Sequence, residues 1–207
     1  MALALTNAAV RPLPPLSARK RWTRAECATL EATGEVDCTH LELVEGELID
    51  KMGKYRPHVA VVNYLAGWLK TVFGEDLVNT EAPIDVSPED FPTSEPIPDV
   101  VVLKRSGWDF RSNPQPADLH LVVEVSDSTL AFDLNTKAAL YARAGIPEYW
   151  ALDIKGQRLI VHREPSGGRY QSVIAYSAGE SVAPLGAPHA QFDPSELFSK
   201  LSALGMG

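Results

Sequence analysis

The stretch that decides the fold reads PIPDVVVL (96–103), DLHLVVEVSDST (118–129) and AFDLNTKAALYARAGIPEYW (131–150). The first two segments are compact runs of β-branched residues, which is typical of strands buried on both faces. The third has helical periodicity from Asp133 to Ala144, and Gly145 ends it. One strand therefore opens on Asp99, the next carries Glu124, and the helix presents Lys137 in its first turn.

The flanking segments predict further elements around the same sheet. LELVEGELID (41–50) alternates on both sides of Glu45-Gly46, as in a β-hairpin whose Val44 faces Glu47. An amphipathic helix follows from about Pro57 to Gly74, with apolar positions at Val59, Val62, Leu65, Ala66, Leu69 and Val72. The other expected elements are a helix capped by Thr23, short strands within 77–87, a meander of strands at 148–154, 158–164, 169–176 and 180–185, and a closing helix at 194–204.

These elements predict an α/β (α+β) protein with a mixed β-sheet core flanked by helices and extra antiparallel hairpins. Residues 1–21, with their prolines and the basic cluster Arg19, Lys20 and Arg21, predict an irregular N-terminal arm. No linker divides the remainder, so residues 22–207 are expected to form a single domain.

Composition is that of an ordinary folded protein, with 45% hydrophobic and 22% charged residues in 207. The net charge of −8 gives no global basic field for nucleic acid, although a local basic groove is compatible with it. Cys27 and Cys38 match neither a disulfide framework nor a zinc pattern, which favours free thiols in a reducing compartment.

Residues 1–22 lack the pattern of a secretory signal, and no apolar run approaches the ~18–20 residues that span a bilayer. We therefore expect a cytoplasmic location and no membrane partner.

Strand alternation decides which side chains share a face with Glu124. It predicts Leu119, Leu121, Val123 and Val125 on one face, and His120, Val122, Glu124 and Ser126 on the other. A buried carboxylate in such a run costs several kcal/mol unless it is paired or bound to a metal. Either Glu124 or Asp99 alone could be a salt-bridge partner. Two acids on adjacent strands instead favour a site of hard oxygen ligands for Mg²⁺ or Mn²⁺.

Three further residues complete the candidate site, each with a plainer alternative. Lys137 could orient a water and stabilise developing phosphorane charge, or could pair with Asp133 four residues earlier on the helix surface. His58 lies in the first turn of its helix, where a lone histidine is more often structural. Glu47 could simply be an exposed hairpin residue. His120, His162 and His189 are assigned structural roles, as are the tyrosines and Trp150, which fit positions in the core or at its rim.

PIPDVVVL, LVVEVSDST, the AFDLNTKAALYARAGIPEYWALD segment and the LELVEGEL…H pattern together resemble the Uma-two family of bacterial restriction-endonuclease-like proteins, within the PD-(D/E)XK nuclease superfamily. The resemblance covers roughly residues 22–200. It implies a restriction-endonuclease-like core, with Asp99 and Glu124 as metal-binding acids and the Val125 carbonyl as a third oxygen ligand. It also implies a homodimer.

The resemblance also assigns the remaining catalytic positions. Ser126 stands where the superfamily places its lysine, and Lys137 matches a lysine that has moved to the following helix. His58 matches the family's histidine, and Glu47 its hairpin glutamate, with Glu42 and Glu45 as alternatives.

The leading functional hypothesis is a Mg²⁺- or Mn²⁺-dependent DNA endonuclease. A non-catalytic nucleic-acid-binding or regulatory module on a nuclease scaffold is the alternative, which Ser126 and the acidic balance favour. Hydrolysis of RNA or a nucleotide is a third, weaker hypothesis. The polar loop SGWDFRSNPQPA (106–117) is a candidate lid, and Lys104, Arg105 and Arg111 beside it are candidate DNA contacts.

Overall fold

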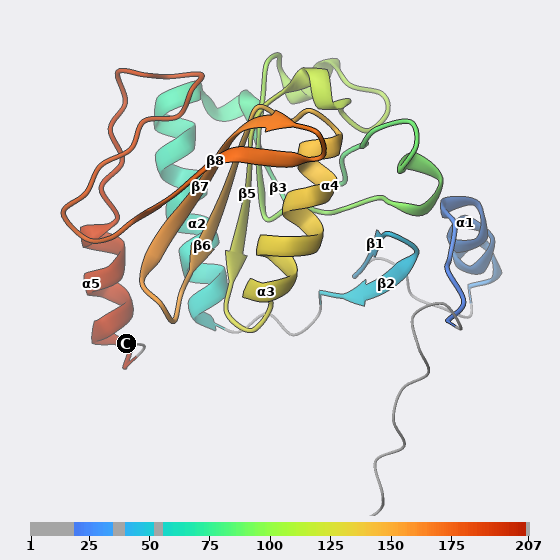
Figure 1. Cartoon of the computed structure of the whole chain (residues 1–207), viewed down its shortest axis with the longest axis horizontal. Helices are drawn as coiled ribbons and strands as arrows, with labels where there is room; N and C mark the ends of the chain where they lie inside the picture. The colour runs from blue at the N-terminus through green and yellow to red at the C-terminus, as the bar shows by residue number, and fades with distance from the viewer. Residues whose placement is uncertain (1–18, 35–39, 52–55, 206–207) are drawn as a thin grey trace, which may run out of the picture.

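The computed structural model of the chain describes residues 19–34, 40–51 and 56–205, in which six strands form one mixed sheet with helices on both faces (Figure 1). The strand order is β3-β4-β5-β6-β7-β8. The strands are β3 (Val78–Thr80), β4 (Val100–Leu103), β5 (Leu119–Ser126), β6 (Glu148–Asp153), β7 (Arg158–Ser166) and β8 (Arg169–Tyr176). The expected fold class is thus confirmed.

Strands β5 and β6 are parallel, whereas every other pair of neighbours in this sheet is antiparallel. A parallel pair needs a crossover, and one helical segment between β5 and β6 provides it. This segment consists of α3 (Leu130–Phe132), a π-helical stretch (Asp133–Lys137) and α4 (Ala138–Arg143). It begins three residues before the predicted start at Asp133, so Lys137 lies beyond the first turn. Such π-helical stretches occur frequently at functional sites.

The two faces of the sheet carry separate cores. Helices α2 (Arg56–Phe73) and α5 (Ser195–Ala203) cover one face, where Leu65, Leu69 and Trp150 are fully buried. The α3–α4 segment covers the other face through residues such as Tyr141. Most of the predicted apolar stripe of α2 is buried, but Val59 is 39% exposed, and Val61, which was not part of that stripe, is buried in the core.

The hairpin of β1 (Leu41–Val44) and β2 (Glu47–Asp50) forms around Glu45-Gly46, as predicted. Both turn residues have positive φ, 48° and 79°, which matches a type I′ turn. Val44 pairs with Glu47 and packs in a small cluster with Leu140 of α4. The hairpin is thereby fixed against the crossover helix.

Helix α1 (Arg24–Thr33) lies near the hairpin and has the expected capping box between Thr23 and Glu26. Trp22 and Arg21 both bond to backbone carbonyls of the hairpin turn. Residues 1–18, most of the proposed arm, lie outside the described residues, as does Cys38. The division into an arm and a single domain therefore stays a prediction.

Two details of the predicted strands were wrong. Register shifts by one residue where Val102 pairs with Leu121 but Leu103 pairs with Leu119, so His120 is an extra residue in β5. Leu119 consequently joins the α4-side core, and the predicted alternation holds only from Leu121 onward. The segment 180–185 forms no strand of its own but a single bridge, because only Val182 pairs, with Phe192.

Within the described residues, no helix has the length and hydropathy to cross a membrane.

Candidate active site

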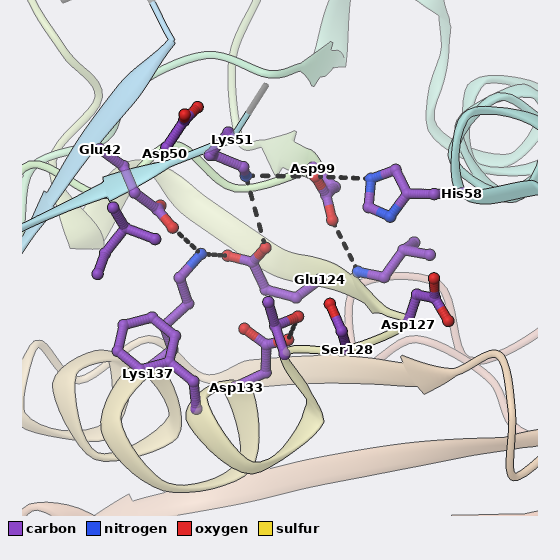
Figure 2. A pocket seen from close by; sticks show the side chains of 14 residues that line it. Glu42, Asp50, Lys51, His58, Asp99, Glu124, Asp127, Ser128, Asp133 and Lys137 are labelled. Carbon is purple, nitrogen blue, oxygen red and sulfur yellow. Dashed lines mark hydrogen bonds and ion pairs between the residues drawn. The ribbon is translucent and has the colours of Figure 1, made fainter. Parts of the chain in front are cut away.

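Asp99 and Glu124 lie side by side at one end of β4 and β5, as Figure 2 shows. Asp99 directly precedes the first residue of β4, and Glu124 directly follows Val123 in β5. Because Val100 pairs with Val123 in antiparallel register, Asp99 and Glu124 lie next to each other at the same end of this strand pair. Both carboxylates are only 2% exposed. They line a pocket of about 170 Å³ whose lining residues are Glu42, Ile49, Asp50, Lys51, His58, Asp99, Glu124, Val125, Asp127, Ser128, Thr129, Phe132, Asp133 and Lys137.

One oxygen of Glu124 is held from the crossover helix. Oε1 accepts hydrogen bonds from Lys137 Nζ at 2.8 Å and from the Tyr141 hydroxyl at 2.7 Å. Burial raises the pKa of the Glu124 carboxyl above its ordinary value, although both Lys137 and Lys51 oppose that shift. Burial and the adjacent Glu124 also raise the pKa of Tyr141, so its hydroxyl remains a donor. Sequence analysis assigned Tyr141 only to the core, and its helical spacing of four residues from Lys137 is the signal that would have found it.

One oxygen of Asp99 is held from the neighbouring strand. Oδ2 accepts the backbone amide of Val125 at 2.8 Å, while Oδ1 lies 3.3 Å from Lys51 Nζ and 3.4 Å from His58 Nε2. Burial alone would raise the pKa of Asp99, but His58, Lys51 and the Val125 amide together lower it well below its ordinary value. Asp99 is therefore ionised. His58 Nε2 is buried and not aligned as a hydrogen-bond donor to Asp99, so it has bonding capacity to spare.

Lys137 lies between two glutamates and is 2% exposed. Its Nζ is 2.8 Å from Glu124 and 2.9 Å from Glu42. Burial would lower the pKa of Lys137, but these two carboxylates raise it above the ordinary value, so the ammonium stays charged. Asp133, the alternative partner considered from sequence, instead accepts the hydroxyls of Ser126 and Thr129, both at 2.7 Å.

The hairpin places Glu42, one of the alternatives considered for the hairpin glutamate, at the pocket, whereas Glu47 lies outside it. Glu42 Oε1 contacts Lys137, and Oε2 accepts the Ile97 amide at 3.1 Å. Glu47 does not line the pocket, and its carboxylate lies 3.5 Å from Arg19 on the surface. Both glutamates lie on the same face of the hairpin, so alternation could not separate them. Packing of Val44 against the crossover helix brings Glu42 to the site and leaves Glu47 beyond it.

Lys51 is a further site residue that the sequence analysis missed. It follows β2 directly, and its backbone amide bonds to the His40 carbonyl. Its Nζ donates to the Ile97 carbonyl and lies 3.3 Å from Asp99 Oδ1 and 3.9 Å from Glu124 Oε2 (Figure 2). The sequence offered only a lysine after a hairpin, a position that is usually solvent-exposed.

The basic loop considered as a DNA contact lies away from the site. Lys104 follows the last residue of β4, and the loop runs from there to the start of β5. Because the strands are antiparallel, this loop is at the opposite end of the strand pair from Asp99 and Glu124. It is therefore not a lid over the pocket, and Lys104, Arg105 and Arg111 do not border it.

The oxygen donors at the pocket are few, but they suit a divalent metal that keeps most of its water. Among the described residues, no three His, Cys, Asp or Glu side chains are grouped as a metal site, and Glu42 already contacts Lys137 and the Ile97 amide. Magnesium, however, typically takes one or two carboxylates, keeps several waters and accepts backbone oxygens. The Val125 amide donates to Asp99. In an extended strand the N–H and C=O groups of one residue point to the same side, so the Val125 carbonyl also points toward Asp99. A cation, the Lys51 ammonium, already lies between the two acids. The residues present thus fit a small, hard cation.

The Tyr141 hydroxyl is expected to stabilise the folded protein through its bond to Glu124. Tyr141→Phe should lower the free energy of unfolding by about 1.5–3 kcal/mol, the range for a hydrogen bond to a charged group. Urea denaturation measures the change. Tyr64→Phe is the matched control, because Tyr64 also donates to a glutamate, Glu196, but at the surface. Equal losses in the two variants would contradict a special role for the buried bond.

Comparisons with known proteins agree with this architecture. A family model with the description "Uma2: Putative restriction endonuclease" matches residues 28–195. The solved structure entitled a putative nuclease belonging to DUF820, from Anabaena variabilis ATCC 29413, superimposes with a TM-score of 0.58 at 17% sequence identity, covering 78% of this chain and 90% of that one. At this identity the likeness shows the fold alone. No curated protein matches the chain in sequence. Because the family model spans most of the sequence, the chain belongs to the Uma2 family.

Proposed function

We propose that the protein is a metal-dependent DNA endonuclease that hydrolyses phosphodiester bonds at the Asp99–Glu124 pocket. The observation that carries the proposal is the convergence of one oxygen of Asp99 and one of Glu124 on a single cation position, with Lys137 behind Glu124. The family description and the nuclease fold support hydrolysis of nucleic acid.

Asp99, Glu124 and the Val125 carbonyl would hold Mg²⁺ or Mn²⁺. Bound there, the ion would supply Lewis acidity toward a phosphoryl oxygen and lower the pKa of a bound water. The protein contributes the rest. Lys137 and Tyr141 fix Glu124 through its inner oxygen, and the Val125 amide fixes Asp99 in the same way. Each acid therefore presents its other oxygen to the pocket without reorganisation.

Lys137 is the proposed group that orients the attacking water and stabilises negative charge, and His58 is the proposed group that exchanges a proton with water. An ammonium has three N–H donors, and the two glutamates occupy two of them. The third is available to orient the attacking water, and the retained charge stabilises the negative charge that develops on the phosphorane. His58 Nε2, buried and short of a hydrogen bond, can accept a proton from a water or donate one to it beside Asp99.

The test is cleavage of supercoiled plasmid DNA by the purified protein with Mg²⁺, with Mn²⁺ and with EDTA. We expect nicked or linear product with either ion, at a rate about 10²-fold or more above that in EDTA. Competition with single-stranded DNA and RNA identifies the preferred nucleic acid. Intact plasmid across a wide range of both ions would contradict the proposal.

A non-catalytic module on the same scaffold is the alternative, and one observation favours it. Lys51 already satisfies both acids without a metal, so the cluster can also be read as a closed network of ion pairs. Calorimetric titration with Mn²⁺ separates the two functions, because a purely structural cluster takes up no ion.

A further inference from the structure

The oxygens of Asp99 and Glu124 divide into two kinds. Asp99 Oδ2 and Glu124 Oε1 are bound at 2.7–2.8 Å by groups of the folded core. Asp99 Oδ1 and Glu124 Oε2 instead face the same atom, Lys51 Nζ, at 3.3 and 3.9 Å. A metal held by both acids must use these two outward oxygens. The position of the Lys51 ammonium therefore coincides with the position that the ion needs.

The two lysines of the site are held very differently. Lys137 makes contacts of 2.8 and 2.9 Å with two carboxylates and is 2% exposed, which is the geometry of a strong, permanent, charge-assisted pair. Lys51 lies farther from its two acids, and its side chain is 15% exposed at the pocket wall. The contacts of Lys51 with the two acids are therefore weaker than those of Lys137, and its displacement also has to break the hydrogen bond from Nζ to the Ile97 carbonyl.

Charge explains why the cluster needs a second cation when no metal is bound. Among the described residues, removal of Lys51 would leave the three buried carboxylates Glu42, Asp99 and Glu124 with Lys137 as their lysine partner and with His58 beside Asp99. Two unneutralised carboxylates at one buried point would repel each other and destabilise the fold. A divalent cation would satisfy both, but an ammonium cannot remain within a few ångströms of it because like charges repel strongly there.

We propose that Lys51 is the built-in counter-ion of the metal-free site and that a divalent cation must displace its ammonium to bind. The inference rests on the proposed function, since it presumes that Asp99 and Glu124 bind a metal. Lys51 thereby holds Asp99 and Glu124 close together and ionised when no metal is bound. Because the metal has to displace Lys51, the affinity of the site for metal is lower than it would be without this lysine. Its backbone stays in place through the bond to His40, so only the side chain has to move.

The experiment is calorimetric titration of metal-free protein with Mn²⁺, combined with thermal unfolding in EDTA. Lys51→Met removes the charge and keeps the length of the stem. We expect it to bind Mn²⁺ about tenfold more tightly than the wild type, or better, as removal of a competing contact worth about 1.4 kcal/mol requires. In EDTA the same variant should melt at a lower temperature. Lys200→Met, which removes a surface partner of Glu196, should match the wild type in both measurements.

Lys51→Arg keeps the charge and tests the idea even if the methionine variant does not fold. A guanidinium can bond two carboxylates at once, so we expect it to bind Mn²⁺ more weakly than the wild type. Tighter binding by Lys51→Arg, or unchanged or weaker binding by a folded Lys51→Met, would overturn the inference while leaving the metal site intact. No heat from any of these proteins would overturn the metal site itself and, with it, the proposed function.

Discussion

Lys137→Met is expected to lower the free energy of unfolding by about 3–5 kcal/mol, the usual effect of removing one partner from a buried ion pair. Methionine fills similar space, so packing changes little. The loss arises because Glu124 and Glu42 remain buried without the ammonium that lies 2.8 and 2.9 Å from them. Urea denaturation is the suitable measurement, since a salt denaturant would screen the charges under study.

Two comparisons isolate the cause. Lys200→Met removes an exposed lysine paired with Glu196 four residues earlier, and should cost only about 0.5 kcal/mol or less. Adding Glu42→Gln and Glu124→Gln to the Lys137 variant removes the stranded charges and should restore a large part of the stability. A loss below about 1 kcal/mol for Lys137→Met alone would show that water reaches these carboxylates and screens their charges.

The same variant is expected to lose nuclease activity, but a destabilised protein makes that result ambiguous. Activity should therefore be compared at a temperature well below the unfolding transition of the variant. Under that condition an active Lys137→Met protein would remove this lysine from the proposed mechanism.

The convergence of Asp99 with Glu124 could be predicted because it depends on local rules. Both strands are continuous β-branched runs, and antiparallel pairing of adjacent strands brings the start of one to the end of the other. The crossover helix then has to return across the sheet, which places Lys137 above Glu124. The sequence pattern contains all of this information within residues 96–150.

The contribution of the hairpin could not be predicted in this way. Alternation puts Glu42 and Glu47 on the same face, and the choice between them depends on where Val44 meets Leu140, a contact nearly 100 positions apart in sequence. Lys51 was missed for the same reason, because its ammonium reaches the site from the end of that hairpin. Non-local docking of a small unit on a helix leaves no periodic signal in its own residues.

The polar loop after Lys104 shows a different limit of sequence reasoning. Its basic residues suggested a DNA contact, but composition says nothing about which end of a strand a loop occupies. Here the antiparallel pairing of β4 with β5 places the loop and the two acids at opposite ends. Charge clusters in sequence therefore need a topology before they can be assigned to a site.

Asp99→Asn is expected to have the largest effect on catalysis, lowering metal-dependent cleavage by at least about 10²–10³-fold. Asparagine is nearly the same size, and its oxygen can still accept the Val125 amide. Its NH₂ group then occupies the outward position, where it presents donors to Lys51 and His58 and has no lone pair for a metal. The charge needed at that position is lost while the shape is preserved.

The measurement is the initial rate of plasmid cleavage in Mg²⁺ and in Mn²⁺, together with circular dichroism to verify the fold. Asp109→Asn, an exposed acid in the loop at the far end of the strands, is the control and should retain the wild-type rate. Because variant and control are purified identically, equal cleavage by all three proteins would reveal a contaminating nuclease. If Asp99→Asn alone fails while remaining folded, hydrolysis depends on the carboxylate whose inner oxygen is bound to Val125 and whose outer oxygen meets Lys51.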